Sequence, residues 1–177
     1  MEQLILSENL ITLIPPNIEE FGFLRVLNLS YNKLTALPDN LFNLTNLEEL
    51  NVHNNKLKEI PEGIGKLVKL ELLVISNNLL TNIPASLEKL QKLNKLSIAF
   101  NALTALPPEL GECKQISWLD ISGNKFEDFP GPLFELPNLQ FLEATSNNIK
   151  AIPENFTCFK FLKEFRASHN KISVLPA

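Results

Sequence analysis

Apolar residues recur along this chain at a fixed spacing of 23 positions. The clearest unit, 24–46, reads LRVLNLSYNKLTALPDNLFNLTN, with constant letters at unit positions 1, 4, 6, 9, 11, 14, 15, 18 and 21. Seven units follow one another without insertion or deletion, and an eighth stops after 16 residues. This period predicts a stack of short units, each of which buries one apolar face against the next.

Unit positions 4 and 6 are apolar, with a variable residue between them, as in 27–29, 73–75 and 119–121. This alternation predicts a short strand with one buried face. Pro follows at position 15 in every unit, where it fixes φ and biases the preceding residue away from helix. Apolar positions 18 and 21, such as Ile64 and Leu67, then predict one turn of 3₁₀ or a short α-helix on the return limb.

Position 9 is Asn in all eight units: Asn9, Asn32, Asn55, Asn78, Asn101, Asn124, Asn147 and Asn170. The chain bends there and leaves backbone groups without sheet partners. A carboxamide both donates and accepts hydrogen bonds, so we expect it to satisfy groups in its own turn and in the adjacent unit. Asp cannot donate and Leu can do neither.

The predicted fold class is α/β: a right-handed β/α solenoid of about eight units. Its parallel strands form a concave sheet, roughly 35–40 Å along the stack at a spacing of about 4.8 Å. Short 3₁₀ or helical limbs form the convex side. The stack curves because these limbs are bulkier than the strands.

Composition narrows the function classes. The apolar fraction is 45%, and no apolar run approaches the roughly 18 residues that cross a bilayer, so membrane insertion is not expected. Charges of both signs are interspersed in a net charge of -4, which argues against nucleic-acid binding. Cys113 falls on an apolar unit position and Cys158 on a polar one in a different unit, so no disulfide is expected and a reducing compartment is favoured.

The variable positions of the inner face, 3, 5, 7, 8 and 10, are where binding specificity can be encoded. Trp118 and Phe141 occupy position 3 of neighbouring strands, so their side chains are expected to touch. An exposed aromatic pair within a charged rim favours a partner-binding site; the alternative is a cross-strand structural brace. The candidate site residues are Leu72, Val74, Lys95, Phe100, Trp118, Asp120, Phe141, Glu143 and Arg166.

Other chemistry is weakly supported. His53 and His169 are five units apart and lie beside no Cys at ligand spacing, so no metal site is expected. The six glycines are scattered and form no phosphate loop, and no nucleophile turn is present. No cofactor and no catalytic residue are therefore predicted. Phe42 and Phe134 at position 19, with Phe23 and Phe161 at position 23, are expected to cover the return limbs, as a minor second surface.

The pattern LxxLxLxxNxLxxLPxx(I/L/F)xx(L/F)xx resembles the leucine-rich repeat of the 23-residue Leu-Pro type, found in Scribble/Erbin-type and Ras-pathway scaffolds. The resemblance covers the whole chain and implies a non-catalytic protein-binding horseshoe. It also suggests a scaffold in cytoplasmic signal transduction, whose partner is a small GTPase or phosphatase complex and which reaches the membrane cortex through partners. Alternatives are the regulatory or targeting arm of a kinase, cyclase or ubiquitin ligase, and a host-interacting effector or recognition protein.

The ends of the chain depart from that family's usual pattern. Met1 stands where the unit has Leu, core letters begin at Leu4, and the chain stops at Ala177 without its last return limb. Terminal units normally carry a polar cap. We therefore expect one domain, 1–177, that is a fragment of a longer protein. The alternative is a natural short protein whose uncapped ends associate end to end or meet a partner.

Overall fold

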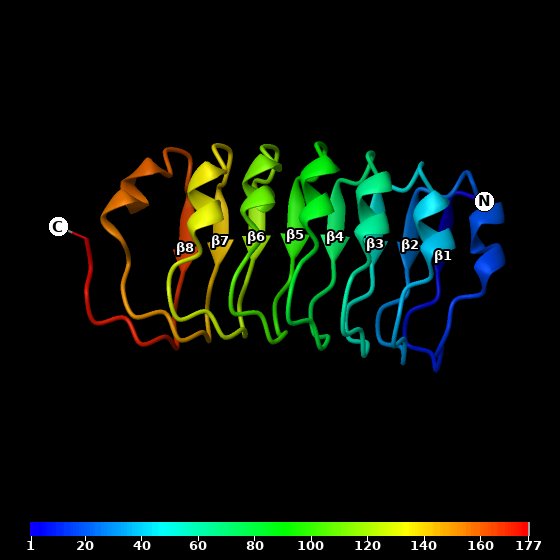
Figure 1. The fold of residues 1–177 in the computed structure, drawn as a ribbon, viewed down its shortest axis with the longest axis horizontal. Coiled ribbons are helices and arrows are strands. Elements are labelled where there is room, and N and C mark those ends of the chain that lie inside the picture. Colours follow the sequence, from blue (N-terminus) through cyan, green and yellow to red (C-terminus); the bar gives the residue numbers. More distant parts are fainter. Residues whose placement is uncertain (177) are drawn as a thin grey trace.

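A computed structural model describes residues 1–176, and it contains one open, curved sheet of eight parallel strands in chain order (Figure 1). The predicted solenoid is confirmed; the predicted domain boundary, Ala177, lies outside the described residues. The strands are β1 (Gln3–Ile5), β2 (Val26–Asn28), β3 (Glu49–Asn51), β4 (Leu72–Val74), β5 (Lys95–Ser97), β6 (Trp118–Asp120), β7 (Phe141–Glu143) and β8 (Glu164–Arg166).

Each return limb is a five-residue 3₁₀-helix that begins after the position-15 proline. Those prolines have φ between -61° and -78°, in extended backbone, as their rings require. The limbs are η1 (Pro16–Glu20), η2 (Asp39–Asn43), η3 (Glu62–Lys66), η4 (Ala85–Lys89), η5 (Pro108–Glu112), η6 (Gly131–Glu135) and η7 (Glu154–Cys158). They lie along the opposite side of the stack from the sheet (Figure 1).

The strands pair in strict register, each residue with the one 23 positions later, as Leu50 pairs with Leu73. The assigned strands cover positions 3 to 5 of the unit, one residue earlier than positions 4 to 6. Sheet-like hydrogen bonding nevertheless continues at position 6, where the N–H of Leu29 donates to the carbonyl of Asn51 at 2.8 Å. Position 4 points into the core in β2–β7, and positions 3 and 5 face the other way.

The asparagine ladder is present as predicted. The Asn55 amide nitrogen donates to the carbonyls of Leu29, 3.0 Å away in the preceding unit, and Val52, 3.1 Å away in its own turn. Its amide oxygen accepts the N–H of Leu34 at 2.9 Å. One side chain thus satisfies backbone groups of two units in a place that water does not reach.

Position 8 holds a constraint that sequence reasoning missed. Backbone φ there lies between +51° and +58° in seven non-glycine residues and is +63° at Gly123. The seven are Glu8, Tyr31, Asn54, Asn77, Phe100, Ser146 and His169. The left-handed residue turns the chain out of the strand. Position 8 is therefore part of the framework as well as variable in sequence.

Side chains on the limbs show that small and large residues in adjacent units fit together. Phe42 is completely buried, and a Cβ added at Gly63 would lie 2.5 Å from its ring. Phe134 is half-buried, while Phe23 and Phe161 are largely exposed, so these four phenylalanines do not form the common cover that we expected. Cys113 is a buried core residue, as predicted, and burial raises the pKa of its thiol to about 11.

The C-terminal units are filled by phenylalanine instead of leucine. Phe129 lies within 5.2–6.2 Å, centroid to centroid, of four other rings: Phe134, Phe156, Phe159 and Phe165. The limb η7 stands farther from η6 than the other limbs stand from their neighbours (Figure 1), and rings from η6, from η7 and from Phe159, which follows η7, contact Phe129 and one another. Within residues 1–176, no helix has the length and hydropathy that crossing a bilayer requires.

Replacing Asn78 by Asp tests the ladder. The carboxylate would face the carbonyls of Val52 and Ile75, to which the amide now donates at 3.0 and 3.1 Å. We expect the free energy of unfolding in urea to fall by about 3 kcal/mol, because these acceptors lose their donor and a charge is buried. Asn82→Asp, at an exposed position, makes the same chemical change and should cost less than about 0.5 kcal/mol. Equal effects of the two substitutions would contradict the ladder's role.

Candidate functional site

The nine predicted site residues lie on the concave side of the sheet, on or beside strands β4 to β8. Leu72 and Val74 of β4 are half-buried on either side of Leu73, which is fully buried in the core. Lys95, Trp118 and Phe141 follow Leu72 at the same register position of β5, β6 and β7. Phe100, Asp120, Glu143 and Arg166 lie on the same face. We call these nine residues the concave surface.

Trp118 and Phe141 share a register position, but the ring contact we expected is not among the aromatic contacts of residues 1–176. The ammonium of Lys163 instead lies 5.9 Å from the centroid of the Phe141 ring. Both aromatic side chains are half-buried, so each keeps part of its surface open to solvent. Part of the apolar area of both side chains therefore remains accessible to solvent.

Phe100 is the most exposed aromatic residue of the concave surface, with 58% of its area accessible. It lies over Gly123 of the next unit, where an added Cβ would be 2.4 Å from its ring carbon Cδ1. Other residue types hold positive φ at this unit position, so backbone conformation alone does not demand glycine there. Gly123 provides the room in which Phe100 lies close to the backbone.

The charges of the concave surface fall into two groups. Arg166 forms ion pairs with Glu143, at 3.0 Å, and with Glu164. Asp120 and Lys95 form no ion pair among the described residues. One carboxylate oxygen of Asp120 accepts the N–H of Ser122 at 2.9 Å, and no described group forms a hydrogen bond or ion pair with the other. The surface therefore combines apolar side chains with one unpaired carboxylate and one unpaired ammonium.

A second part of the concave face, over β1 to β4, was not singled out from the sequence. A hollow of about 280 Å³ is lined there by Gln3, Ile5, Val26, Leu27, Asn28, Glu49, Asn51 and Leu72. The side-chain oxygens of Asn28 and Asn51 accept the N–H two residues onward, at 3.0 and 2.9 Å. Their amide N–H groups remain available to a ligand. The hollow therefore extends the concave surface with neutral hydrogen-bond donors.

A series of aromatic and polar contacts links three successive units beyond the ends of β2, β3 and β4. The ring of Tyr31 meets the ring of His53 edge to face, with 5.0 Å between centroids. His53 Nδ1 lies 2.8 Å from the Ser76 hydroxyl. Partial burial lowers the pKa of His53, and an interaction with the backbone of Ser76 opposes that shift. We find no sequence signal that would have revealed this contact, because it depends on side-chain rotamers in three successive units.

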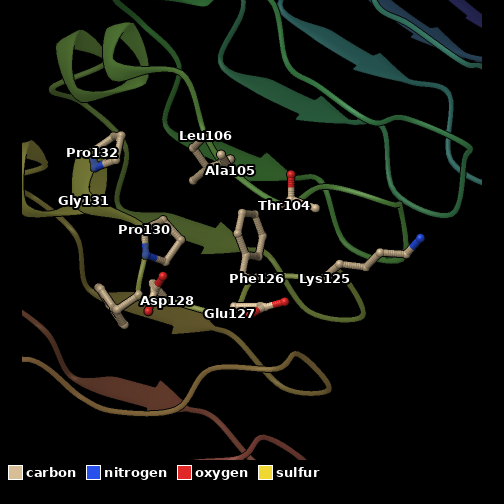
Figure 2. Close-up of a pocket in the computed structure, with 11 residues that line it drawn as sticks. Thr104, Ala105, Leu106, Lys125, Phe126, Glu127, Asp128, Pro130, Gly131 and Pro132 are labelled. Carbon is tan, nitrogen blue, oxygen red and sulfur yellow. The ribbon is translucent and has the colours of Figure 1, made fainter.

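A larger hollow, of about 440 Å³, lies away from the sheet between the turns that follow β5 and β6 (Figure 2). Thr104, Leu106, Phe126 and Asp128 are among the residues that line it. Glu127, at the same site, pairs with Lys150 at 2.7 Å, which lowers the pKa of its carboxyl group. The phenyl ring of Phe126 is buried in its wall, and no nucleophile and base are brought together there.

Nothing in the described residues assembles a metal-binding group: no three His, Cys, Asp or Glu side chains converge. His53 and His169 lie in different units, as the spacing indicated. What the concave face offers is a broad, gently hollowed surface with apolar, donor and charged groups. Such a surface is suited to binding a partner by contact area.

The description "Leucine-rich repeat region" matches residues 3–105, and "Leucine rich repeat" matches residues 91–149. The chain belongs to the leucine-rich repeat family. The leucine-rich repeat fold is a protein-interaction module and is typically non-catalytic. No curated protein matches the sequence significantly.

Solved leucine-rich repeat structures resemble the chain over nearly its whole length. A leucine-rich repeat protein of Leptospira interrogans is 33% identical, with a TM-score of 0.94, and the match covers 98% of this chain and 44% of that chain. The ectodomain of the receptor kinase GASSHO1/SCHENGEN3 from Arabidopsis thaliana, in complex with Casparian strip integrity factor 2, is 28% identical with a TM-score of 0.80, covering 100% and 22%.

The Arabidopsis receptor kinase HAESA, in complex with the peptide hormone IDA and the co-receptor SERK1, is 29% identical, with a TM-score of 0.81. That match covers 94% of this chain and 29% of HAESA. In each of these three comparisons the chain spans less than half the length of the matched protein. The repeats are thus shared, and the further regions of those proteins lie outside the match.

The arrangement of Phe100 over Gly123 is open to a direct test. Asn tolerates the left-handed backbone, as Asn54 and Asn77 show at the same unit position, so Gly123→Asn should lower stability by less than about 1 kcal/mol. The new side chain would occupy the place of the Phe100 ring and displace it. We expect the Phe100 ring resonances to shift in NMR spectra while the melting temperature changes little. Unchanged ring resonances would contradict the packing described.

Proposed function

We propose that this leucine-rich repeat chain is a non-catalytic module that binds a protein partner through an extended segment lying across its concave face. The observation that carries the proposal is the open apolar surface formed by Phe100, Trp118 and Phe141 beside Leu72 and Val74. Exposed aromatic groups that are not used to close the core are the side chains that most often supply binding energy.

The shape of the sheet supports an extended ligand. Eight parallel strands in register give a face roughly 35 Å long, which an extended segment of about ten residues would cross. The hollow over β1–β4 adds amide donors to one half of this path. Related folds in the plant receptor structures are seen with peptide ligands, which supports a peptide segment as the part recognised.

We also propose a cellular role, a class of partner and a location for this module. The resemblance to Scribble/Erbin-type and Ras-pathway repeats supports a scaffold in signal transduction, with a small GTPase or phosphatase complex as partner. The free thiols of Cys113 and Cys158 are compatible with a reducing, cytoplasmic location. Exposed apolar side chains at both ends, Leu10 and Leu13 at one and Leu175 at the other, support end-to-end contact with another chain.

A second candidate function is that of a recognition arm on a larger signalling protein. The observation in its favour is that the matched structures include ectodomains of receptor kinases. Sequencing the complete transcript would decide: a catalytic domain joined to these repeats would favour the arm, and its absence would favour the separate module.

Binding on the concave face is tested with a phage-displayed library of random peptides about ten residues long, selected on the whole chain. We expect selected peptides to lose at least about thirtyfold in affinity on Trp118→Ala with Phe141→Ala, because buried aromatic anchors are worth about 2 kcal/mol or more. The control is Phe23→Ala, at an aromatic residue that is 79% exposed and outside the concave surface; it should change nothing.

Calorimetry would measure the affinities, and thermal unfolding would be followed in parallel. If the double variant lost stability but kept its affinity for the selected peptides, the two aromatic residues would be a structural brace and the proposed site would be wrong. The proposed site would also be wrong if no selected peptide depended on these two residues.

A further inference from the structure

The unpaired carboxylate of Asp120 indicates what kind of segment the concave surface accepts. Asp120 is the last residue of β6, at unit position 5. Ser97 of β5 and Glu143 of β7 lie beside it in the register. Ser97 is uncharged and buried, and Glu143 is engaged by Arg166 at 3.0 Å. Within its row, therefore, Asp120 has no cation beside it that would neutralise its charge.

The fold itself does not require a charge at this position. In β2 and β3, the oxygens of Asn28 and Asn51 accept the N–H two residues onward, at 3.0 and 2.9 Å. Asp120 does the same for Ser122 at 2.9 Å. A neutral amide supplies that acceptor equally well, so the carboxylate adds a negative charge that local structure does not use. Its second oxygen forms no hydrogen bond or ion pair among the described residues.

Aromatic residues of the concave surface come from the same strand as Asp120 and from the turn beside its end. Trp118 is two residues earlier on the same strand, so both side chains project to the concave side of β6. Phe100 lies over Gly123, just beyond the end of that strand. A carboxylate near aromatic side chains is suited to bind a cationic side chain with an apolar stem. The cation pairs with the carboxylate, and the stem packs against the aromatic rings.

We propose that the segment recognised on the concave face carries a Lys or Arg that pairs with Asp120, next to an aliphatic or aromatic residue that packs on Phe100 and Trp118. The inference rests on the proposed function, since it names the chemistry of the partner at the same surface. Lys95, one strand away, forms no ion pair with Asp120 and places a positive charge at the other side of Trp118. The Lys or Arg of the recognised segment therefore lies over β6 and not over β5.

The experiment uses the same random peptide library, selected on the wild-type chain and on Asp120→Asn. This substitution reproduces what Asn28 and Asn51 do naturally, so the fold is preserved. The wild-type chain should enrich peptides with Lys or Arg beside an apolar residue. Those peptides should bind Asp120→Asn between about tenfold and a hundredfold more weakly, the range expected for a charge-assisted hydrogen bond.

Asp39→Asn is the matched control, because it makes the same chemical change as Asp120→Asn. Asp39 is an exposed carboxylate in the first turn of η2, on the opposite side of the stack from the sheet, and it forms no ion pair among the described residues. Neutralising it changes the net charge by the same amount as Asp120→Asn. Affinity for the selected peptides should stay within about twofold of the wild-type value, since exposed charges at this separation are largely screened.

The outcomes separate the inference from the proposed function. Peptides that need Trp118 but lack a basic residue, or that bind Asp120→Asn and the wild type equally, would overturn the inference and leave the proposed function standing. An equal loss of affinity on Asp39→Asn would show that only net charge matters and would also overturn the inference. If no selected peptide depends on Trp118, both fail.

Discussion

The structure depends on one requirement: the backbone groups where each strand ends must be hydrogen-bonded although they are buried. Asn55 shows how this is met, because its single side chain donates to the preceding unit and to its own turn and accepts from the preceding unit's loop. The requirement recurs every 23 residues, so an insertion between a strand and its asparagine would move that asparagine out of reach of its partners. Hydrogen bonding between neighbouring units therefore fixes the spacing of this part of each unit.

The curvature of the stack and the layout of its concave face both follow from the 23-residue repeat. The strands pair with strict register, and the 3₁₀ limbs occupy the other side of the stack. Leu73 and its equivalents turn inward, which forces Leu72 and Val74 outward onto the concave face. The face therefore displays two residues from each strand in aligned rows. A partner that crosses the strands meets one unit after another, and each unit can differ without disturbing the core.

Local rules were sufficient to predict the strands, the proline-initiated limbs and the asparagine ladder, because each depends on residues within one unit or its immediate neighbour. The left-handed backbone of position 8 was missed, since Tyr31 and Phe100 are residues that seldom adopt it. Phe42 was misplaced because its burial depends on Gly63, 21 residues later. The missing ring contact between Trp118 and Phe141 shows that register fixes backbones and leaves side-chain rotamers free.

In this chain, different atoms of the same residue can serve the structural framework and the exposed concave face. At unit position 5, one side-chain oxygen of Asn28 or Asp120 accepts a hydrogen bond from the turn after the strand, and the other polar atom of the side chain forms no hydrogen bond among the described residues. At position 8, the backbone of Phe100 makes the left-handed turn while its ring lies exposed over Gly123. Substitution between Asn and Asp, or between glycine and a larger residue, therefore changes what the face presents while the turn keeps its hydrogen bonds. This division allows a rigid stack to vary the chemical groups that its concave face presents.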